Sequence, residues 1–167
     1  MKKNLLIISL IALNLFQHEI VNAQWAQTNG PYGADIKALA TDGINVYAGT
    51  RHDGVFHSTN PANTGWTEGN TGLTSKDITS FLINGSTVFA GTNDLGIFRS
   101  SDNGNSWTAV PTGLPGAQVT SFVLSGANIF VGYFCGGICF SGNNGASWTS
   151  ANTAGLTDYY INALAAN

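Results

Sequence analysis

Four tryptophans at a constant interval constrain the fold of this 167-residue chain more than any other feature. They are Trp25, Trp66, Trp107 and Trp148, and each follows the one before it by 41 residues. A period of roughly 20 to 50 residues is typical of stacked arrays, in which one supersecondary unit is copied along the chain. The sequence therefore predicts repeats near residues 25–65, 66–106, 107–147 and 148–167.

Each repeat contains the same succession of short apolar runs and polar turns. Runs rich in β-branched and aromatic residues, separated by pairs such as Asp-Gly, Asn-Gly and Ser-Gly, predict antiparallel hairpins. We expect first strands at 36–40, 78–82, 119–123 and 161–165, second strands at 46–50, 88–92 and 129–133, and third strands at 55–58, 97–100 and 138–141. The tryptophan of the next repeat is expected to begin the fourth strand.

The predicted strands are apolar on both faces, as Phe81, Leu82 and Ile83 show. A sheet with one side in water would alternate apolar and polar residues, so each sheet must lie between two others. Ala-Gly and Val-Gly pairs in the second strands suit the crowded centre of a radial array. We predict an all-β, incomplete β-propeller of about three blades plus one strand. A parallel β-solenoid is the alternative, although its coils rarely need three hairpin turns per repeat.

The first segment has the pattern of a secretory signal peptide. Met1, Lys2 and Lys3 form a basic start, residues 5–16 are apolar, and Val21 and Ala23 are small residues at the positions that signal peptidase recognises. The apolar run is shorter than the roughly 20 residues that a membrane-spanning helix needs. We therefore expect cleavage after residue 23, a propeller over residues 24–167 and a secreted bacterial protein, extracellular or in the cell envelope.

Composition narrows the classes of partner. The whole chain has 43% hydrophobic and only 9% charged residues, and the part after residue 23 has four basic and eight acidic residues, a net charge of −4. No basic cluster is present, whereas a nucleic-acid partner requires a band of Lys and Arg against its phosphates. We expect no nucleic-acid partner, no membrane span after signal cleavage, no cofactor and no metal.

The last repeat stops at Asn167, after its first strand. An unfinished sheet exposes an edge that pairs readily with another strand. We therefore expect the N-terminal fragment of a longer propeller, whose last blade the segment around Trp25 would complete. The open edge would be covered by the missing blades or by an oligomeric partner.

One turn carries a family motif. Residues 100–107, Ser-Ser-Asp-Asn-Gly-Asn-Ser-Trp, resemble the Asp-box, or bacterial neuraminidase repeat, of sialidase-like propellers, photosystem II assembly factors and sortilin-type receptors. Residues 141–148 match with Asn143 in place of the aspartate, and residues 58–66 match poorly. The motif residues are Ser100, Asp102, Gly104, Trp107, Ser141, Asn143, Gly145 and Trp148.

These motif residues have a structural explanation. Asp102 can accept hydrogen bonds from its own turn, Gly104 can adopt a positive φ, and Trp107 can fill the space beside a neighbouring blade. A calcium loop is the alternative, since Asp102, Asn103 and Asn105 offer oxygen donors, but such loops usually gather several carboxylates.

The resemblance to sialidases implies three arginines that hold a substrate carboxylate, a Tyr and Glu pair and an Asp acid/base. After residue 23 the chain has two arginines, Arg51 and Arg99, and one glutamate, Glu68, so no residue can be given a catalytic role. Asp53 and Asp94 lie in corresponding loops and could act as a carboxylate pair in glycoside hydrolysis, although an Asp in a turn is the simpler explanation. The residues present favour a non-catalytic protein over an enzyme.

Two functional classes remain. The first is a secreted, non-catalytic binding propeller that recognises a protein or a glycan through loops on one face. Its candidate contact residues are Tyr32, Arg51, His52, Asp53, Asn93, Asp94 and Tyr133. The second is the N-terminal part of a secreted, sialidase-like glycosidase whose catalytic residues lie beyond this sequence. Fold resemblance does not choose between them.

The two cysteines flank a three-residue segment. In an exported protein Cys135 and Cys139 could close a disulfide across the mouth of a hairpin. Cys139 also aligns with Phe56 and Phe98, so a buried apolar role is the alternative.

Overall fold

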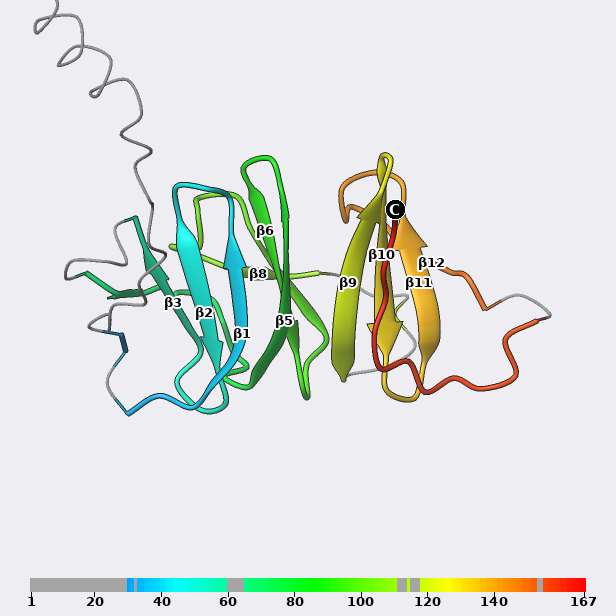
Figure 1. Cartoon of the computed structure of the whole chain (residues 1–167), viewed down its shortest axis with the longest axis horizontal. Coiled ribbons are helices and arrows are strands. Elements are labelled where there is room, and N and C mark those ends of the chain that lie inside the picture. Colours follow the sequence, from blue (N-terminus) through cyan, green and yellow to red (C-terminus); the bar gives the residue numbers. More distant parts are fainter. Residues whose placement is uncertain (1–29, 32, 60–64, 111–113, 115–117, 153–154) are drawn as a thin grey trace, which may run out of the picture.

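A computed structural model describes residues 30–31, 33–59, 65–110, 114, 118–152 and 155–167. The predicted signal peptide, Trp25 and Tyr32 lie outside the described residues. The described residues contain three four-stranded antiparallel sheets, which we call blades 1 to 3, and in each the spatial order of the strands follows their order in sequence (Figure 1).

The strands are short and come in the same succession in each blade. Blade 1 holds β1 (Ile36–Thr41), β2 (Val46–Thr50), β3 (Val55–Ser58) and β4 (Thr67–Glu68). Blade 2 holds β5 (Ile78–Asn84), β6 (Thr87–Thr92), β7 (Ile97–Ser100) and β8 (Thr108–Ala109). Blade 3 holds β9 (Val119–Ser125), β10 (Asn128–Tyr133), β11 (Gly137–Ser141) and β12 (Thr149–Ser150).

The predicted all-β architecture of four-stranded units is confirmed, with two differences. Trp66, Trp107 and Trp148 each precede a fourth strand instead of beginning it: their side chains are buried or half-buried, whereas the two strand residues that follow each of them are exposed. Residues 161–165 form no strand, whereas a first strand was expected there. A first strand pairs with the second strand of its own blade, and this sequence ends before such a partner.

Successive residues of a strand point to opposite faces of the sheet, so each blade has two faces. We call the face toward the preceding blade the N-side face and the other the C-side face. In blade 2 the N-side face includes Ile78, Phe81, Val88, Ala90 and Phe98, and the C-side face includes Phe89, Gly91 and Ile97. Both faces are buried, which is why the strands are apolar on both sides.

Two apolar clusters join the blades. In the first, Tyr47 and Val55 of blade 1 pack with residues of the N-side face of blade 2, and Leu73 and Trp107 complete it. In the second, Phe89 and Ile97 of blade 2 pack with Val119, Ile129, Val131, Tyr133, Cys139 and Trp148. The core of this chain therefore lies between the sheets.

A glycine in each second strand allows the blades to approach closely. A Cβ on Gly49 would lie 2.5 Å from Cγ2 of Ile78, and one on Gly91 would lie 2.5 Å from Cγ1 of Val119. These distances are too short for carbon atoms in contact, so only glycine fits at either position. We call this arrangement the glycine notch: a glycine of one blade receives the β-branched first residue of the next first strand.

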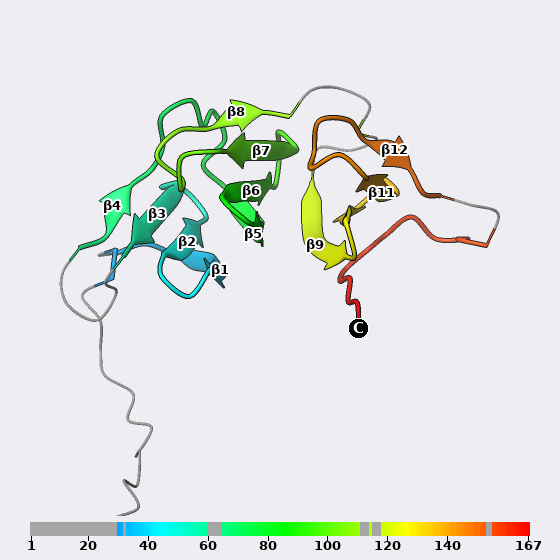
Figure 2. The same cartoon turned by 90° about the horizontal axis from the view of Figure 1, so that it is seen from above.

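The blades follow one another along an arc (Figure 2). The first strands β1, β5 and β9 lie on its inner side and contact one another in succession, and the two-residue fourth strands lie on its outer side. No helix within the described residues is long and apolar enough to cross a membrane.

Candidate binding face

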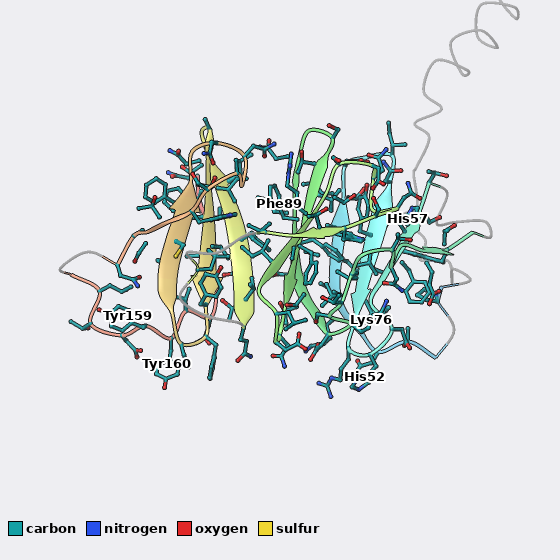
Figure 3. All side chains as sticks on the ribbon, turned by 180° about the vertical axis from the view of Figure 1, so that it is seen from behind. His52, His57, Lys76, Phe89, Tyr159 and Tyr160 are labelled. Atoms are coloured by element: carbon teal, nitrogen blue, oxygen red, sulfur yellow. The ribbon has the colours of Figure 1, made fainter. Side chains whose placement is uncertain are left out.

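The loops between second and third strands open at one end of the blades, which we call the loop face. Figure 3 places His52, Lys76 and Tyr160 at this end, whereas His57 and Phe89 lie toward the other. The loops are residues 51–54 in blade 1, 93–96 in blade 2 and 134–136 in blade 3. They extend from strands that are buried on both faces, so side chains on them are held by a rigid support.

Threonine hydroxyl groups fix the first two loops. Thr50 donates to the carbonyl of Gly54 (3.1 Å) and accepts from the N–H of Asp53 (2.8 Å). Thr92 makes the same pair of bonds in blade 2, donating to Gly96 (2.8 Å) and accepting from Leu95 (3.0 Å). Because both hydroxyls are buried, the loops are anchored from within and present only their central residues to solvent.

Among the described residues, no partner holds the side chains of the first loop tightly. Arg51, His52 and Asp53 are all exposed. The Nε of Arg51 lies 3.3 Å from Oδ2 of Asp35, and both side chains are more than half exposed, at 52% and 60%. An exposed ion pair of this kind contributes little to stability, so the Arg51 guanidinium can exchange partners at low cost.

The second loop brings Asn93 and Asp94 to the same face. Both are exposed, and the N–H of Asn93 donates to the carbonyl of Asp77 (3.0 Å). The buried hydroxyl of Ser75 donates to a carboxylate oxygen of Asp94, which fixes the orientation of that carboxylate. Five of the seven predicted contact residues are therefore exposed in these two loops, and Tyr32 lies outside the described residues.

Tyr133 was predicted to be a contact residue, and this prediction is wrong. Its side chain is fully buried in the cluster between blades 2 and 3, and its hydroxyl has no hydrogen-bond partner among the described residues. Burial raises the pKa of this hydroxyl far above its usual range, with a smaller contribution from Cys139. The residue lies on the same face of β10 as Ile129 and Val131, which directs it into the core.

Instead of Tyr133, other aromatic residues lie on the loop face, and none of them was predicted from the sequence to be a contact residue. Phe134 is 41% exposed and Tyr160 is 57% exposed, and their rings meet edge to face with centroids 5.1 Å apart. Tyr159, next to this pair, is 48% exposed. Phe134 follows a second strand directly, and this position in the repeat was the signal that could have identified it.

Backbone hydrogen bonds hold this aromatic pair in place. The N–H of Gly137 donates to the carbonyl of Tyr159 (3.0 Å), and the N–H of Ile161 donates to the carbonyl of Tyr133 (3.0 Å). The first bond is equivalent to the one between Gly54 and Lys76 (3.1 Å), which joins blade 1 to the segment leading into blade 2. Residues 159–161 therefore dock on blade 3 as the start of a following repeat does.

Two asparagines, also not selected from the sequence, brace the loops from behind. Asn70 accepts a bond from the N–H of Val55 (2.9 Å) and donates to the carbonyl of Asp53 (2.9 Å). Asn152 does the same in blade 3, with the N–H of Ile138 (2.7 Å) and the carbonyl of Gly136 (3.0 Å). Each asparagine lies just after a fourth strand and is bonded to the loop between the second and third strands of the same blade. These bonds restrict movement of that loop relative to the blade.

The turn at residues 100–107 lies at the opposite end of blade 2 and is closed by its own side chains. Oδ1 of Asp102 accepts from the hydroxyl of Ser100 (2.7 Å) and the N–H of Ser106 (2.9 Å), and Oδ2 accepts from the hydroxyl of Ser106 (2.6 Å). These bonds, those from Ser106 first, lower the pKa of Asp102 from 3.8 to about 2. Asn103 and Gly104 have φ of 57° and 82°.

Blade 3 has the same turn with Asn143 in place of the aspartate. Its Oδ1 accepts from the hydroxyl of Ser141 and the N–H of Ser147 (both 2.9 Å), while its Nδ2 donates to the hydroxyl of Ser147 (2.8 Å). An amide thus reproduces the pattern because the serine hydroxyl can turn from donor to acceptor. Among the described residues, no three His, Cys, Asp or Glu side chains are grouped so that they could hold a metal ion.

The tryptophan after the first of these turns joins two blades. The Nε1 of Trp107 donates to the carbonyl of Gly69 (2.8 Å), and its backbone N–H donates to the carbonyl of Thr71 (2.8 Å). Both acceptors belong to the segment after β4. The indole therefore fixes blade 2 against blade 1 at the outer side of the arc.

The predicted disulfide is not formed. Cys135 is exposed in the turn after β10, whereas Cys139 is fully buried opposite Val131 in β11. Burial raises the pKa of the Cys139 thiol. The side chain of Cys139 occupies the apolar position of Phe56 and Phe98, which points it into the core and away from the turn.

Comparison with known proteins identifies the architecture. No protein-family model matches the chain, and no curated protein sequence does. Among solved structures, the computationally designed Ika4 protein superposes with a TM-score of 0.66 at 13% identity, over 83% of each chain. YCF48 from Cyanidioschyzon merolae superposes with a TM-score of 0.59 at 16% identity, and the GH74 enzyme of Niastella koreensis with 0.58 at 21%.

These likenesses show the fold alone: the chain is built as part of a β-propeller. It covers 83% of Ika4 but only 40% of YCF48 and 20% of the GH74 enzyme, with 76% and 78% of its own length matched to those two. A second YCF48 structure, solved with a D1 peptide bound, superposes with a TM-score of 0.55 at 17% identity over 69% of this chain and 40% of that one.

Proposed function

We propose that this chain is part of an exported, non-catalytic β-propeller that binds a protein or glycan ligand on its loop face. The observation that carries the proposal is the exposed pair of Phe134 and Tyr160, held by backbone bonds at the end of the blades where the loops open. Arg51, His52, Asp53, Asn93 and Asp94, exposed in the two neighbouring loops, supply polar groups.

Aromatic side chains on a rigid support are efficient binding groups. They offer a large contact area and lose little conformational entropy when a ligand orders them. The Phe134 and Tyr160 rings already contact each other, and the segments that carry them are joined by hydrogen bonds, so part of the ordering cost is met before a ligand arrives. Isolated exposed apolar residues need no explanation, but a fixed pair of rings at a loop end is consistent with a contact surface.

The comparisons are consistent with this proposal at the level of fold. YCF48, one of the propellers that this chain resembles, has been solved with a peptide bound. The Asp-box resemblance of residues 100–107 and the signal-like pattern of residues 1–23 support export of such a propeller. We place the protein outside the cytoplasm, either extracellular or in the cell envelope of a bacterium.

Binding is tested with the exported chain on two arrays, one of glycans and one of synthetic peptides. We expect a ligand on one array, and a loss of affinity of tenfold or more in the Phe134→Ala, Tyr160→Ala double variant, because buried aromatic contacts dominate such interfaces. Leu124→Ala is the control, since Leu124 is also partly exposed, at 36%, but lies near the turn between β9 and β10, at the other end of the blade. Binding that survives the double variant, or no binding on either array, would contradict the proposal.

A glycosidase remains the second candidate, and one observation favours it. Asp53 and Asp94 project from corresponding loops of adjacent blades, as a carboxylate pair for glycoside hydrolysis would require. In this case the remaining catalytic groups would be outside this sequence. A screen with fluorogenic glycosides, sialosides included, separates the candidates. Turnover that disappears in both Asp53→Asn and Asp94→Asn would establish the enzyme and overturn the binding proposal.

A further inference from the structure

We propose that a cleft between blades 2 and 3 binds a small organic carboxylate through Arg99. The cleft, which we call the outer cleft, has a volume of about 270 Å³ and lies between the C-side face of blade 2 and the turn at residues 141–148 of blade 3. It is separate from the loop face and does not depend on the proposed binding function. The lining residues that carry the argument are Arg99, Ser101, Thr108, Val110, Gly145 and Ala146.

The same place between blades 1 and 2 is closed. Gly69 follows β4, and its N–H donates to the carbonyl of Val55 (2.9 Å). A Cβ on Gly69 would collide with the carbonyl oxygen of Gly104, in the turn of blade 2. The Nε1 of Trp107 donates to the carbonyl of Gly69 (2.8 Å). The turn of blade 2 can therefore lie directly against the end of β4, because Gly69 has no side chain.

Between blades 2 and 3 a valine stands at the place of this glycine. The N–H of Val110 donates to the carbonyl of Ile97 (2.9 Å), as that of Gly69 does to Val55. Because valine has a side chain, the turn of blade 3 cannot approach β8 as closely as the turn of blade 2 approaches β4. Val110, Gly145 and Ala146 instead line the outer cleft.

A buried indole N–H supports this reading of the contact. Trp148 corresponds to Trp107 and is only 8% exposed, yet its Nε1 has no hydrogen-bond partner among the described residues. Buried polar groups are nearly always hydrogen-bonded. The bond that closes the contact between blades 1 and 2 is therefore missing between blades 2 and 3, on the side where Val110 replaces Gly69.

The charges at the two contacts differ as well. Arg99 corresponds to His57, since each pairs with the first residue of a fourth strand. Burial lowers the pKa of His57, and the charge of Asp102, in the turn of blade 2, opposes this shift. The turn of blade 3 has the neutral Asn143 where that of blade 2 has Asp102. Arg99 forms no ion pair within the part of the chain that the structure describes, so its charge is open to a ligand.

The groups that line the outer cleft favour a carboxylate. A guanidinium is planar, and its paired N–H donors match the two oxygens of a carboxylate. Ser101 and Thr108 add hydroxyl groups, and Val110 and Ala146 offer an apolar wall to a short carbon chain. The volume of about 270 Å³ lies below the roughly 300 to 1,000 Å³ of pockets for drug-sized ligands, so the acid must be small.

The test is a titration of the exported, ¹⁵N-labelled chain with sodium butyrate, followed by the NMR shifts of its backbone amides. Butyrate replaces sodium chloride at constant low ionic strength, because salt screens an exposed charge. We expect saturable shifts at Gly145 and Ala146 with a Kd of about 1 to 10 mM, the range of one or two weak contacts. Butyramide, which has the same size but no charge, should give no saturable shift.

Three variants locate the site. Arg99 is exposed, so Arg99→Gln leaves the core intact and should weaken butyrate binding by about tenfold. Lys37→Gln is the matched control: it removes a positive charge that Asp77 holds at 2.9 Å in blade 1, and affinity should stay within about twofold. Val110→Gly gives blade 2 the residue that blade 1 has at this place. It should weaken butyrate binding and slow the exchange of the Trp148 indole N–H with solvent, because the contact can then close.

The proposal is overturned if butyrate gives no saturable shift at Gly145 and Ala146, or if butyramide binds as tightly as butyrate. It is also overturned if Arg99→Gln or Val110→Gly leaves the affinity for butyrate unchanged, or if Lys37→Gln weakens binding as much as Arg99→Gln does. None of these outcomes bears on ligand binding at the loop face, which is tested separately with the Phe134→Ala, Tyr160→Ala double variant.

Discussion

Replacing Asp102 by Asn should change the response of stability to acid and little else. In the folded chain the pKa of this carboxyl lies at about 2, against 3.8 for the free group, because Ser106 and Ser100 donate hydrogen bonds to its charged form. A carboxyl whose pKa falls on folding stabilises the folded state above the unfolded pKa. That contribution is lost as pH falls from about 4 to about 2.

The magnitude follows from the shift and from exposure. A shift from 3.8 to about 2 corresponds to at most about 2.5 kcal/mol, since one pKa unit is about 1.4 kcal/mol. Asp102 is exposed, and solvent screening reduces the effect to about 1 kcal/mol or less. Asn143 shows that an amide can make the corresponding three bonds, so Asp102→Asn should cost no more than about 1 kcal/mol at pH 7. Asp102→Ala loses all three and should cost about 1 to 3 kcal/mol.

The assay is urea denaturation of the wild type and the two variants at several pH values between 7 and 2. The advantage of the wild type over Asp102→Asn should be present at pH 6 and disappear by pH 2. Asn143→Ala is the control, because it removes the equivalent bonds in blade 3 without removing a titrating group, and its cost should not depend on pH. A difference between wild type and Asp102→Asn that is the same at pH 6 and pH 2 would refute the reasoning.

Three further substitutions test other contacts by urea or thermal denaturation. Gly91→Ala should destabilise the chain by about 1 to 3 kcal/mol, since its Cβ would lie 2.5 Å from a valine methyl of blade 3. Gly65→Ala, with no atom within 4 Å of the added carbon, is its control and should be nearly neutral. Tyr133→Phe should leave stability unchanged or raise it by up to about 1 kcal/mol, because the hydroxyl it removes is buried without a partner, and a clear loss would show that the hydroxyl is bonded. Burial lowers the pKa of His57 below 6.5, and the charge of Asp102 opposes this shift. The free energy of unfolding should therefore decrease as pH falls below 6.5, because the unfolded chain takes up a proton more readily. His57→Gln should make this decrease smaller.

The sequence predicted the repeat and the strands well, for a simple physical reason. Strands buried on both faces must be apolar along their length, and the turns between them need residues such as Asp42 and Gly43 that tolerate tight backbone geometry. Both signals are local, so they survive in a single sequence. The fourth strands were predicted less accurately, because only two residues of each pair with the third strand and so short a stretch carries little local pattern.

The candidate site was predicted less completely, because its composition depends on which way side chains point. Tyr133 was chosen for its place at the end of a strand, although its alternation with Ile129 and Val131 already indicated a buried side chain. Cys139 could have been excluded from a disulfide in the same way. The meeting of Phe134 with Tyr160 could not be anticipated, because it depends on how the segment after β12 docks on blade 3.

The glycine notch receives an isoleucine, a valine and a second isoleucine at three successive places along the chain, with almost the same close approach at each. The seats are therefore interchangeable, and any unit that begins with a β-branched residue and carries its own glycine can be inserted or removed without redesigning its neighbours. A duplicated 41-residue repeat would therefore meet the same glycine and the same kind of β-branched side chain at both of its neighbours, so the number of blades could change without a new type of contact.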